Sequence, residues 1–502
     1  MTATETLLVQ WPAALVLGPL LAAVAAFAWP RAGAAVGLAT SAASLAGALA
    51  LAAAILAAGP VQVVPGGWAA PLGIALHADG LAALMIAMTA GVGSAVALAA
   101  THTPGARQGQ HEDEGHDPDQ GVAFWPLWLL LLAGLNGLYL SADAFNLYIT
   151  LEIVGLAAVG LTALSGTPES VRAALTYLLA GLMGSLLFLL GVALLYAAYG
   201  RVDFAGLATA TAAGPAMSAA LVAMLVGLAL KTAIVPLHVW LPAAHANATP
   251  PASALLSALV IKGSLYAAIR LWLTVFEPAA ALGTLMGLLG AGAILWGSVQ
   301  ALRAPRLKLV VAYSTIAQVG LILVAFAVAG DDAAAVAWRG AVCLMLAHAV
   351  AKAAMFLAVG RIVALAGTDD LARLGRARVR PGPAMFAFAL AAVSLIGLPP
   401  SGGFTGKWLL LAGSIAAGAW PWAAAIAAAT LLSAAYMTRV LARFLDTEDV
   451  PADTIVRPGW ARADAVPLAL AVAAAGLGLA AGGPLALLAA EAPAVARVGD
   501  PM

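Results

Sequence analysis

The stretch LALKTAIVPLHVWLP, Leu228–Pro242, combines an apolar helical pattern with a lysine and, five residues later, a proline. Proline removes a helix hydrogen bond and leaves backbone carbonyls unpaired, which a membrane tolerates only where these groups face protein or a water-filled cavity. The stretch GLPPSGGFTGKW, Gly397–Trp408, repeats the combination, with two prolines ahead of a lysine. Interrupted membrane helices of this kind are typical of transporters. The two stretches therefore predict a transport protein built from membrane-spanning helices.

The composition excludes a water-soluble globular protein. Of the 502 residues, 63% are hydrophobic and only 9% are charged, whereas soluble domains carry roughly 25% charged residues. Apolar runs of about 20 residues, the length that spans a bilayer, recur from Trp11 to Leu488 and are separated by short polar joints. We count about fourteen such runs, with the interrupted stretches in the seventh and the twelfth. The sequence therefore predicts an all-α integral membrane protein with discontinuous helices 7 and 12.

The spacing of the two interrupted runs predicts internal symmetry. The seventh and twelfth runs are five apart, and an odd offset gives two five-helix units opposite orientations in the membrane, as in the inverted repeats of many transporters. The predicted organisation is an N-terminal three-helix segment, a first repeat, a second inverted repeat, and a C-terminal loop with one helix. The boundaries of these four parts are 1–120, 121–278, 279–445 and 446–502.

The distribution of arginine residues predicts the orientation of the protein in the membrane. When the joints are assigned alternately to the two membrane faces, most arginines fall on one face, including the cluster between Arg361 and Arg380. Cytoplasmic loops carry the excess of basic residues, so both termini of this multi-pass cell-membrane protein are predicted to lie outside the cytoplasm. The segment Gly59–Asp79, which Gly and Pro interrupt, is expected to form an extracellular turn or short hairpin.

The lysines indicate the function. The chain contains five, and four of them, Lys231, Lys262, Lys352 and Lys407, lie inside long apolar runs. An ammonium group at the middle of a bilayer costs about 2.5–3.5 kcal/mol, so intramembrane lysines generally line a polar path or bind a ligand. Withdrawal from water favours the neutral amine, which allows a lysine to exchange protons. The pattern therefore indicates transport of protons or of another cation.

Glu152, in FNLYITLEIVG, is the only acid well inside an apolar run. A lone buried carboxylate would become protonated and could be purely structural, whereas one paired with a buried lysine of another helix would stay charged. Such a pair acts as a switch, because separating the charges releases the proton of the lysine and closing the pair restores it. Both interpretations of Glu152 follow from its position.

Histidines extend the polar set. His238 and His245 follow Lys231 at intervals of seven, which puts all three on one face of an unbroken helix. His348 precedes Lys352 by one helical turn. Alternating histidine and lysine side chains, with water between them, can pass protons sideways between helices. The alternative is that these residues only join helices by hydrogen bonds.

Lys262, Tyr266 and Arg270 repeat every four residues and therefore share a helix face. Lys308 lies close to a predicted helix end. It is either part of the relay or an anchor whose long side chain reaches the membrane surface.

Other candidate sites carry weaker signals. The loop HEDEGHDPD, His111–Asp119, mixes imidazoles and carboxylates, but its spacing specifies no metal geometry and favours a solvated loop. The single cysteine, Cys343, allows no intrachain disulfide and is expected to pack inside the membrane. The sequence contains neither a cysteine cluster nor a Gly-rich phosphate loop, so no cofactor is predicted, and its dispersed arginines give no nucleic-acid signal.

Five stretches resemble the family of proton-conducting antiporter subunits shared by the membrane arm of respiratory complex I, membrane-bound hydrogenases and Mrp-type sodium/proton antiporters. They lie in order between Asp143 and Trp408 and read FNLYITLE, LKTAIVPLHVWLPAAHANATPPASALLSALVIKG, LKLVVAYSTIAQVG, HAVAKAAMF and GLPPSGGFTGKW. The resemblance implies fourteen helices, two inverted five-helix repeats and broken seventh and twelfth helices. The FNLY run, the lysine at 407 and the chain length look most like the D subunit of Mrp antiporters.

The resemblance also implies roles for single residues. Glu152 would be the acid of the fifth helix and Lys231 its partner in the seventh, while Lys407 would face a second half-channel. Thr176 stands where many relatives carry lysine, and Arg306 where they often carry an acid. The complete predicted proton relay consists of Glu152, Lys231, His238, His245, Lys262, Lys308, His348, Lys352 and Lys407.

Together these observations predict a membrane subunit of a multisubunit antiporter that exchanges protons for a cation, with sodium favoured, and that assembles with other membrane subunits. One alternative is a proton-pumping subunit of a complex I-like dehydrogenase or membrane-bound hydrogenase, which neighbouring genes for iron–sulfur proteins would favour. A second is a membrane partner in ion-dependent inorganic-carbon uptake. Transport that persists without Glu152 and Lys231 would support this last alternative.

Overall fold

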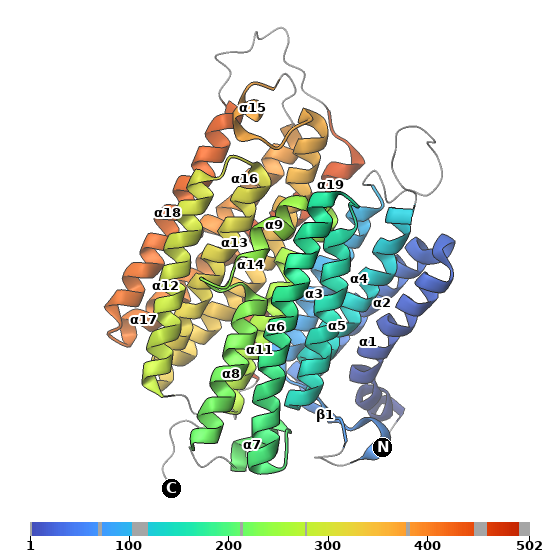
Figure 1. The fold of residues 1–502 in the computed structure, drawn as a ribbon, viewed down its shortest axis with the longest axis vertical. Coiled ribbons are helices and arrows are strands. Elements are labelled where there is room, and N and C mark those ends of the chain that lie inside the picture. The colour runs from blue at the N-terminus through green and yellow to red at the C-terminus, as the bar shows by residue number, and fades with distance from the viewer. Residues whose placement is uncertain are drawn as a thin grey trace.

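The computed structural model describes residues 3–68, 73–102, 119–210, 214–276, 279–377, 382–445 and 459–490. Within these ranges the chain forms a bundle of long, roughly parallel helices (Figure 1). Twelve of the described helices are long and apolar enough to cross a membrane, which confirms the all-α membrane fold. The other two predicted runs are each divided into shorter helices, Gly382–Ile396 with Gly402–Ala416 and Ala465–Gly476 with Gly482–Ala489.

The α-helices of the first half of the chain are α1 (Ala3–Ala28), α2 (Gly33–Ala58), α3 (Gly80–Ala100), α4 (Asp119–Leu140), α5 (Ala144–Ala163), α6 (Pro168–Tyr199), α7 (Phe204–Ala210), α8 (Pro215–Thr232), α9 (Trp240–Asn247), α10 (Pro250–Leu255) and α11 (Ile261–Thr274). Those of the second half are α12 (Ala280–Arg303), α13 (Leu307–Leu323), α14 (Asp331–Ala366), α15 (Leu371–Gly375), α16 (Gly382–Ile396), α17 (Gly402–Ala416), α18 (Trp420–Leu445), α19 (Ala465–Gly476) and α20 (Gly482–Ala489). Short 3-10 turns are η1 (Pro30–Ala32), η2 (Pro65–Gly67), η4 (Val324–Ala327) and η6 (Arg462–Asp464), and η3 (Leu256–Val260) is a π-helical turn between α10 and α11.

The segment between α2 and α3 forms the predicted hairpin. Strands β1 (Val61–Val63) and β2 (Leu76–Ala78) pair in antiparallel register. Asp79 follows β2 directly and caps α3, because its carboxylate accepts the backbone N–H of Ala82 at 2.9 Å. The hairpin and α7 lie at the same end of the bundle (Figure 1).

Both predicted interruptions are present. α8 ends at Thr232 and α9 begins at Trp240, so the break includes Pro236. α16 ends at Ile396 and α17 begins at Gly402, so the second break includes both neighbouring prolines. The first break begins with Ala233 at a φ of 58°, a left-handed conformation that is unfavourable for residues with a side chain. The break therefore depends on the packing around it.

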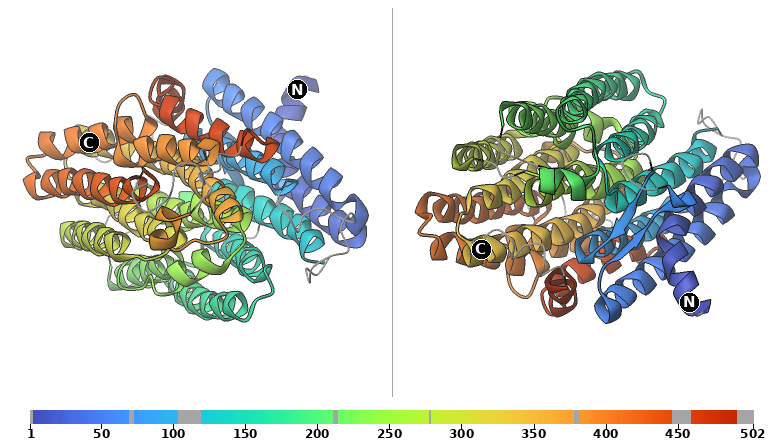
Figure 2. Two further views of the ribbon diagram at one scale, coloured as in Figure 1. Left: turned by 90° about the horizontal axis from the view of Figure 1, so that it is seen from above. Right: turned by 90° about the horizontal axis from the view of Figure 1, so that it is seen from below.

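The longest helix, α14, has 36 residues and lies in the interior of the bundle. It packs against α13, α16 and α17 of its own half, and against α10 and α3 of the first half. Viewed along the helix axes, the blue N-terminal helices lie at one edge of the bundle and the orange helices α17 and α18 at the opposite edge (Figure 2). α14 thus joins the two halves.

Of the weaker sequence candidates, Cys343 lies within the described structure and most of the acidic loop does not. Cys343 lies on α14 and is a buried free cysteine, as predicted. Residues 111–118 of the acidic loop fall outside the described residues, so the prediction of a solvated loop is unchanged.

Candidate functional site

Glu152 and Lys231 form an ion pair between α5 and the end of α8. Lys231 Nζ donates a hydrogen bond to Glu152 Oε1 at 2.9 Å, and the Ser185 hydroxyl on α6 donates to the same oxygen. The side chain of Lys231 is 9% exposed and that of Glu152 is 22% exposed. One oxygen of the Glu152 carboxylate thus accepts two hydrogen bonds, one from the ammonium and one from the hydroxyl. The structure therefore brings together the two residues whose pairing the family resemblance implied.

The helix break determines where Lys231 lies. Lys231 belongs to the last turn of α8, where carbonyls without an intrahelical partner favour a positive charge. The indole of Trp240, the first residue of α9, donates to the Leu230 carbonyl at 2.9 Å. Thr232 donates to Ser264 on α11 at 2.8 Å. These contacts fix the end of α8, and hence the lysine, against its neighbours.

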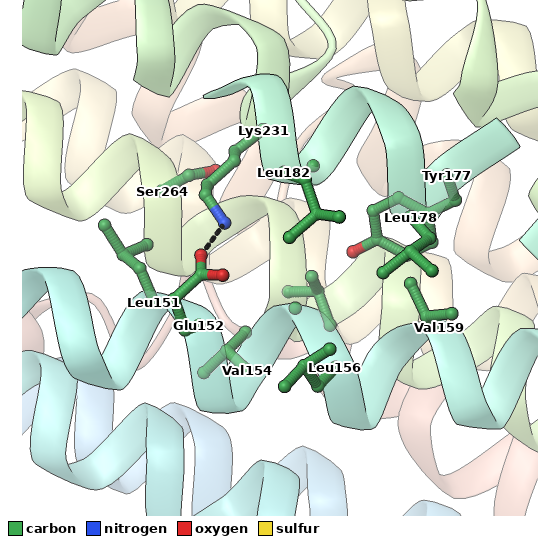
Figure 3. A pocket seen from close by; sticks show the side chains of 13 residues that line it. Leu151, Glu152, Val154, Leu156, Val159, Tyr177, Leu178, Leu182, Lys231 and Ser264 are labelled. Carbon is green, nitrogen blue, oxygen red and sulfur yellow. Dashed lines mark hydrogen bonds and ion pairs between the residues drawn. The ribbon is translucent and has the colours of Figure 1, made fainter. Parts of the chain in front are cut away.

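A pocket adjoins the ion pair. Tyr177, Ser264 and the two charged residues supply its polar groups, and aliphatic side chains, mostly of α5 and α6, form the rest of its wall (Figure 3). Leu156 and Leu182 of this wall are 54% and 41% exposed. The pocket therefore reaches the outer surface of the described bundle.

Lys262 lies at the start of α11, next to the π-helical turn. It is fully buried and donates to the carbonyl of Ser257, a residue within that turn. The Ser257 hydroxyl is 3.0 Å from the Thr315 hydroxyl of α13. π-helical turns are rare inside α-helices and are frequently found at functional sites. Here the turn gives the lysine a carbonyl partner and links the two halves of the bundle.

Two histidines and Lys352 lie at the centre of the bundle. Lys352 is fully buried and donates to the Val311 carbonyl at 2.6 Å and to the Ser314 hydroxyl. His245 stacks on Phe356 with ring centroids 5.0 Å apart. Both ring nitrogens of His245 and of His348 are buried without a hydrogen bond in the described structure. Buried polar atoms of this kind are normally bonded to protein or water, so these ring nitrogens are candidate partners for water.

Lys407 binds the end of the second interrupted helix. Its ammonium donates to the carbonyls of Leu395 and Ile396 at 3.2 and 2.8 Å. These carbonyls belong to the last turn of α16, whose hydrogen bonds the break removes. Lys407 is 5% exposed. Both interrupted helices thus end beside a buried lysine.

The remaining two relay candidates lie farther from the centre. His238 lies in the first break, where its Nε2 accepts the indole N–H of Trp296 at 2.8 Å. Trp296 is 46% exposed on α12, so His238 is turned towards the periphery of the bundle. Lys308 lies at the start of α13 and donates to the Ala248 carbonyl at 3.0 Å. The roles of both residues remain predictions.

The sequence did not reveal the ion pair between Asp79 and Arg270. The guanidinium donates to both carboxylate oxygens, with one N–O distance of 2.7 Å, and also to the Tyr266 hydroxyl. Tyr266 in turn donates to the Tyr139 carbonyl at 2.6 Å. Burial alone would raise the pKa of Asp79, but the charge and hydrogen bonds of Arg270 outweigh burial and lower it. The sequence did contain a signal for this pair. Asp79 directly precedes one apolar run and Arg270 lies inside another.

Comparisons with known proteins agree with this arrangement. A family model described as "NADH:quinone oxidoreductase/Mrp antiporter, TM" matches residues 141–433, which is more than half of the chain. The N subunit of NADH-quinone oxidoreductase from Desulforudis audaxviator (strain MP104C) is 37% identical over 389 residues, covering 76% of this chain and 75% of that protein. The D subunit of a Na(+)/H(+) antiporter from Bacillus subtilis (strain 168) is 33% identical over 357 residues, covering 70% and 69%.

Solved structures give the same result. A chain of the Mrp complex from Dietzia sp. DQ12-45-1b superposes with a TM-score of 0.83 at 26% identity, covering 99% of this chain and 98% of that one. A chain of an archaeal membrane-bound sulfane sulfur reductase has a TM-score of 0.84 at 26% identity, covering 97% and 98%. The family resemblance noted in the sequence is confirmed. This protein is therefore a multi-pass membrane subunit of the NADH:quinone oxidoreductase/Mrp antiporter transmembrane family.

Proposed function

We propose that this protein conducts protons within a multisubunit antiporter that exchanges them for a monovalent cation, with sodium as the first candidate. The observation that carries the proposal is the Glu152–Lys231 ion pair beside the break of an interrupted helix. Its sodium assignment is supported by the relatives that are named as D subunits of Na(+)/H(+) antiporters. A relative named as a probable K(+)/H(+) antiporter component makes potassium the second cation to test.

The ion pair can control a proton because its geometry can change. While Glu152 is 2.9 Å from Lys231, the carboxylate stabilises the ammonium form. When the end of α8 moves and the charges separate, the lysine is left in apolar surroundings that favour the neutral amine. Lys231 then gives its proton to the next group of the path. The break in the helix supplies the joint at which such a movement is possible.

A row of buried groups can receive the proton. Lys262 connects the first half to the central histidines, and Lys352 and Lys407 continue the row in the second half. Each of these three lysines is bound to backbone carbonyls or hydroxyls, which stabilise its charged form less than a carboxylate would. The row is therefore suited to transient protonation rather than to permanent ion pairing.

A second candidate function is proton pumping in a redox complex. It is favoured by the 37% identity to the N subunit of an NADH-quinone oxidoreductase. The same side chains would then move protons, with electron transfer in partner subunits as the driving reaction. Exchange driven by sodium or potassium in the complete complex distinguishes the two functions, because only the antiporter requires a monovalent cation.

The test uses inverted vesicles from a strain that lacks its own antiporters and expresses the complete native gene cluster. We expect sodium to dequench a pH-sensitive dye with the wild-type protein but not with Lys231→Ala. Asp203→Asn is the matched control, since Asp203 forms an ion pair with Arg201 outside the long helices. Exchange that persists in Lys231→Ala would contradict the proposed path, and an assembled wild-type complex without exchange would favour the redox function.

A further inference from the structure

The pocket beside the ion pair lies at the depth of the lipid chains. Glu152 is near the middle of α5, a helix of 20 residues that is long and apolar enough to cross a membrane. Such a helix spans the hydrocarbon core, which is about 30 Å thick, so Glu152 lies close to the midplane. Leu156 and Leu182 of the pocket wall are exposed on the outside of the bundle. A ligand can therefore enter this pocket sideways from the bilayer.

Two polar atoms of the pocket have no hydrogen-bond partner in the part of the chain that the structure describes. Lys231 and Ser185 both donate to Oε1 of Glu152, so its Oε2 has no donor among the described residues. Tyr177 is 4% exposed and stacks on Trp240 with ring centroids 4.0 Å apart, yet its hydroxyl bonds to none of the described groups. Figure 3 shows that the Glu152 and Tyr177 side chains both point into the space between α5 and α6. Buried polar atoms are normally hydrogen-bonded, so the pocket offers both atoms to a ligand.

These two atoms and the wall around them define the chemistry of the ligand. A carboxylate oxygen only accepts hydrogen bonds, and the N–H groups of a cation form the strongest bonds to it. Most of the wall is aliphatic, with Leu151, Val159 and Leu178 among its side chains, so the body of the ligand must be apolar. The pocket comprises about 440 Å³ including its open mouth, which is within the range of small-molecule sites. An amphiphilic amine, with one ammonium group and an aromatic or aliphatic body, meets these requirements.

The pocket fits an amine better than it fits a lipid. A lipid acyl chain would leave both polar atoms without a partner, and lipid headgroups lie at the membrane surface. We propose that this pocket binds amphiphilic amines from the bilayer, with the cationic nitrogen on Glu152 Oε2 and the apolar body between α5 and α6. Such a ligand occupies the ion pair on which proton transfer depends, so it inhibits transport. This consequence rests on the proposed function, whereas the binding does not.

Photo-cross-linking in the purified complex tests the binding. The probe is an aryl trifluoromethyl diazirine with a propylamine chain, and the control probe carries a hydroxyl in place of the amine. Mass spectrometry should find the amine probe on peptides of α5 or α6 about tenfold more often than the control, because a hydrogen bond between charged groups is the stronger one. Glu152→Gln should lower labelling by the amine to the level of the control probe. Equal labelling by the two probes, or amine labelling that survives Glu152→Gln, would overturn the proposal and assign the pocket to lipid chains.

A second variant fills the pocket and leaves the ion pair in place. Gly181 of α6 lines the pocket, and a Cβ at this position would meet no atom within 4 Å. Gly181→Leu therefore puts a side chain into the free space, and we expect labelling of α5 and α6 by the amine to be lost. Gly292→Leu on α12 is the matched control, because this position is equally open but does not line the pocket. Labelling that is undiminished in Gly181→Leu, or equally diminished in Gly292→Leu, would overturn the proposal.

Transport gives a separate readout. In the sodium-driven vesicle assay, the amine should inhibit a smaller fraction of the exchange in Gly181→Leu than in Gly292→Leu. Any effect of a weak base on the pH gradient is the same for both variants, so the difference reports the pocket. If the wild-type complex exchanges nothing, the proposed function fails while cross-linking still decides whether the amine binds. If exchange is normal but labelling shows no preference for the amine, only the present inference fails.

Discussion

The buried lysines differ in what their ammonium groups touch. Lys231 contacts a carboxylate, whereas Lys262 and Lys407 donate to carbonyls at irregular points of interrupted helices. Lys352 combines a carbonyl with a serine hydroxyl. A carboxylate stabilises the charged lysine far more than a carbonyl does. We therefore expect Lys231 to be the group that holds a proton longest and the others to carry it briefly.

The Asp79–Arg270 ion pair gives a prediction for stability. Asp79→Asn leaves the guanidinium nearly buried without its counter-charge, and breaking such a pair costs about 3–5 kcal/mol. Because the folded-state pKa of Asp79 is lowered, the stabilisation is present above the ordinary carboxyl pKa and is lost as the pH falls below it. Thermal unfolding in detergent should show a lower Tm for Asp79→Asn at pH 7.

The same measurement at low pH supplies the control. The difference in Tm between wild type and Asp79→Asn should shrink as the pH falls below about 4, where an ordinary aspartate becomes protonated. Asp203→Asn, at a partly exposed ion pair, should change Tm much less. An equal decrease in Tm for the two variants at neutral pH would contradict the larger contribution to stability expected of the Asp79–Arg270 pair.

At the scale of helices, close packing depends on glycines that face each other. Gly290 on α12 lies against Gly320 on α13, so that a Cβ at position 290 would be 2.6 Å from the Gly320 carbonyl oxygen. Gly292, two residues on, has no atom within 4 Å of the corresponding position. Small residues let membrane helices approach closely. Alanine substitutions at these two positions therefore distinguish the effect of helix packing from that of helix propensity.

We expect Gly290→Ala to destabilise the protein by about 1–3 kcal/mol, because α12 and α13 must move apart. Gly292→Ala should be neutral or stabilising by up to about 1 kcal/mol, since alanine favours the helix. Thermal unfolding of the two variants in the same detergent compares them directly. Similar losses of stability in both variants would show that the close α12–α13 contact is not the cause of the loss.

Sequence reasoning succeeded for the elements whose signal is local. Both breaks were predicted because proline cannot donate a helix hydrogen bond, and the short hairpin because Gly and Pro interrupt an apolar segment. The division between α19 and α20 was not predicted, since the intervening residues, from Leu477 to Ala481, contain no proline and only one glycine. Small apolar residues fit a continuous helix equally well.

The site was predictable only in part, because distances between helices are not determined within one segment. Burial of Glu152 and the lysines could be predicted from the apolar runs around them, but the partner of Glu152 came from family resemblance. Ser185 on α6 and the Asp79–Arg270 pair were missed, because each contact joins elements far apart in the chain. Nothing in the spacing of His238 indicated that it would face Trp296.

At the scale of the whole molecule, a close glycine contact recurs in both halves of the bundle, and the two inverted repeats stay a prediction. Gly184 on α6 faces Gly227 on α8, and Gly340 on α14 faces Gly406 on α17. These helix pairs occupy corresponding places in the two predicted repeats. The interrupted helices α8 and α17 also both carry a buried lysine. Equivalent contacts at equivalent places are what a duplicated unit would retain.

The predicted orientation can be tested with the single native cysteine removed. In a Cys343→Ser background, Ala372→Cys places a thiol on exposed α15 and Ala205→Cys places one on exposed α7 at the other end of the bundle (Figure 1). An impermeant maleimide should label position 372 only in inverted vesicles and position 205 only in right-side-out vesicles. The opposite pattern would reverse the orientation that the arginines predict.

The unequal partners of the lysines have an electrical consequence. Of the four lysines inside apolar runs, Lys231 is the one that has a carboxylate beside it in the described structure, so a proton that arrives at Lys262, Lys352 or Lys407 adds an uncompensated charge inside the bilayer. Moving one such charge across the whole membrane changes its energy by about 2.3 kcal/mol per 100 mV. Each step along the row moves the charge through a fraction of that field. Voltage across the membrane should therefore alter the rate of turnover even when the concentrations of both ions are held constant.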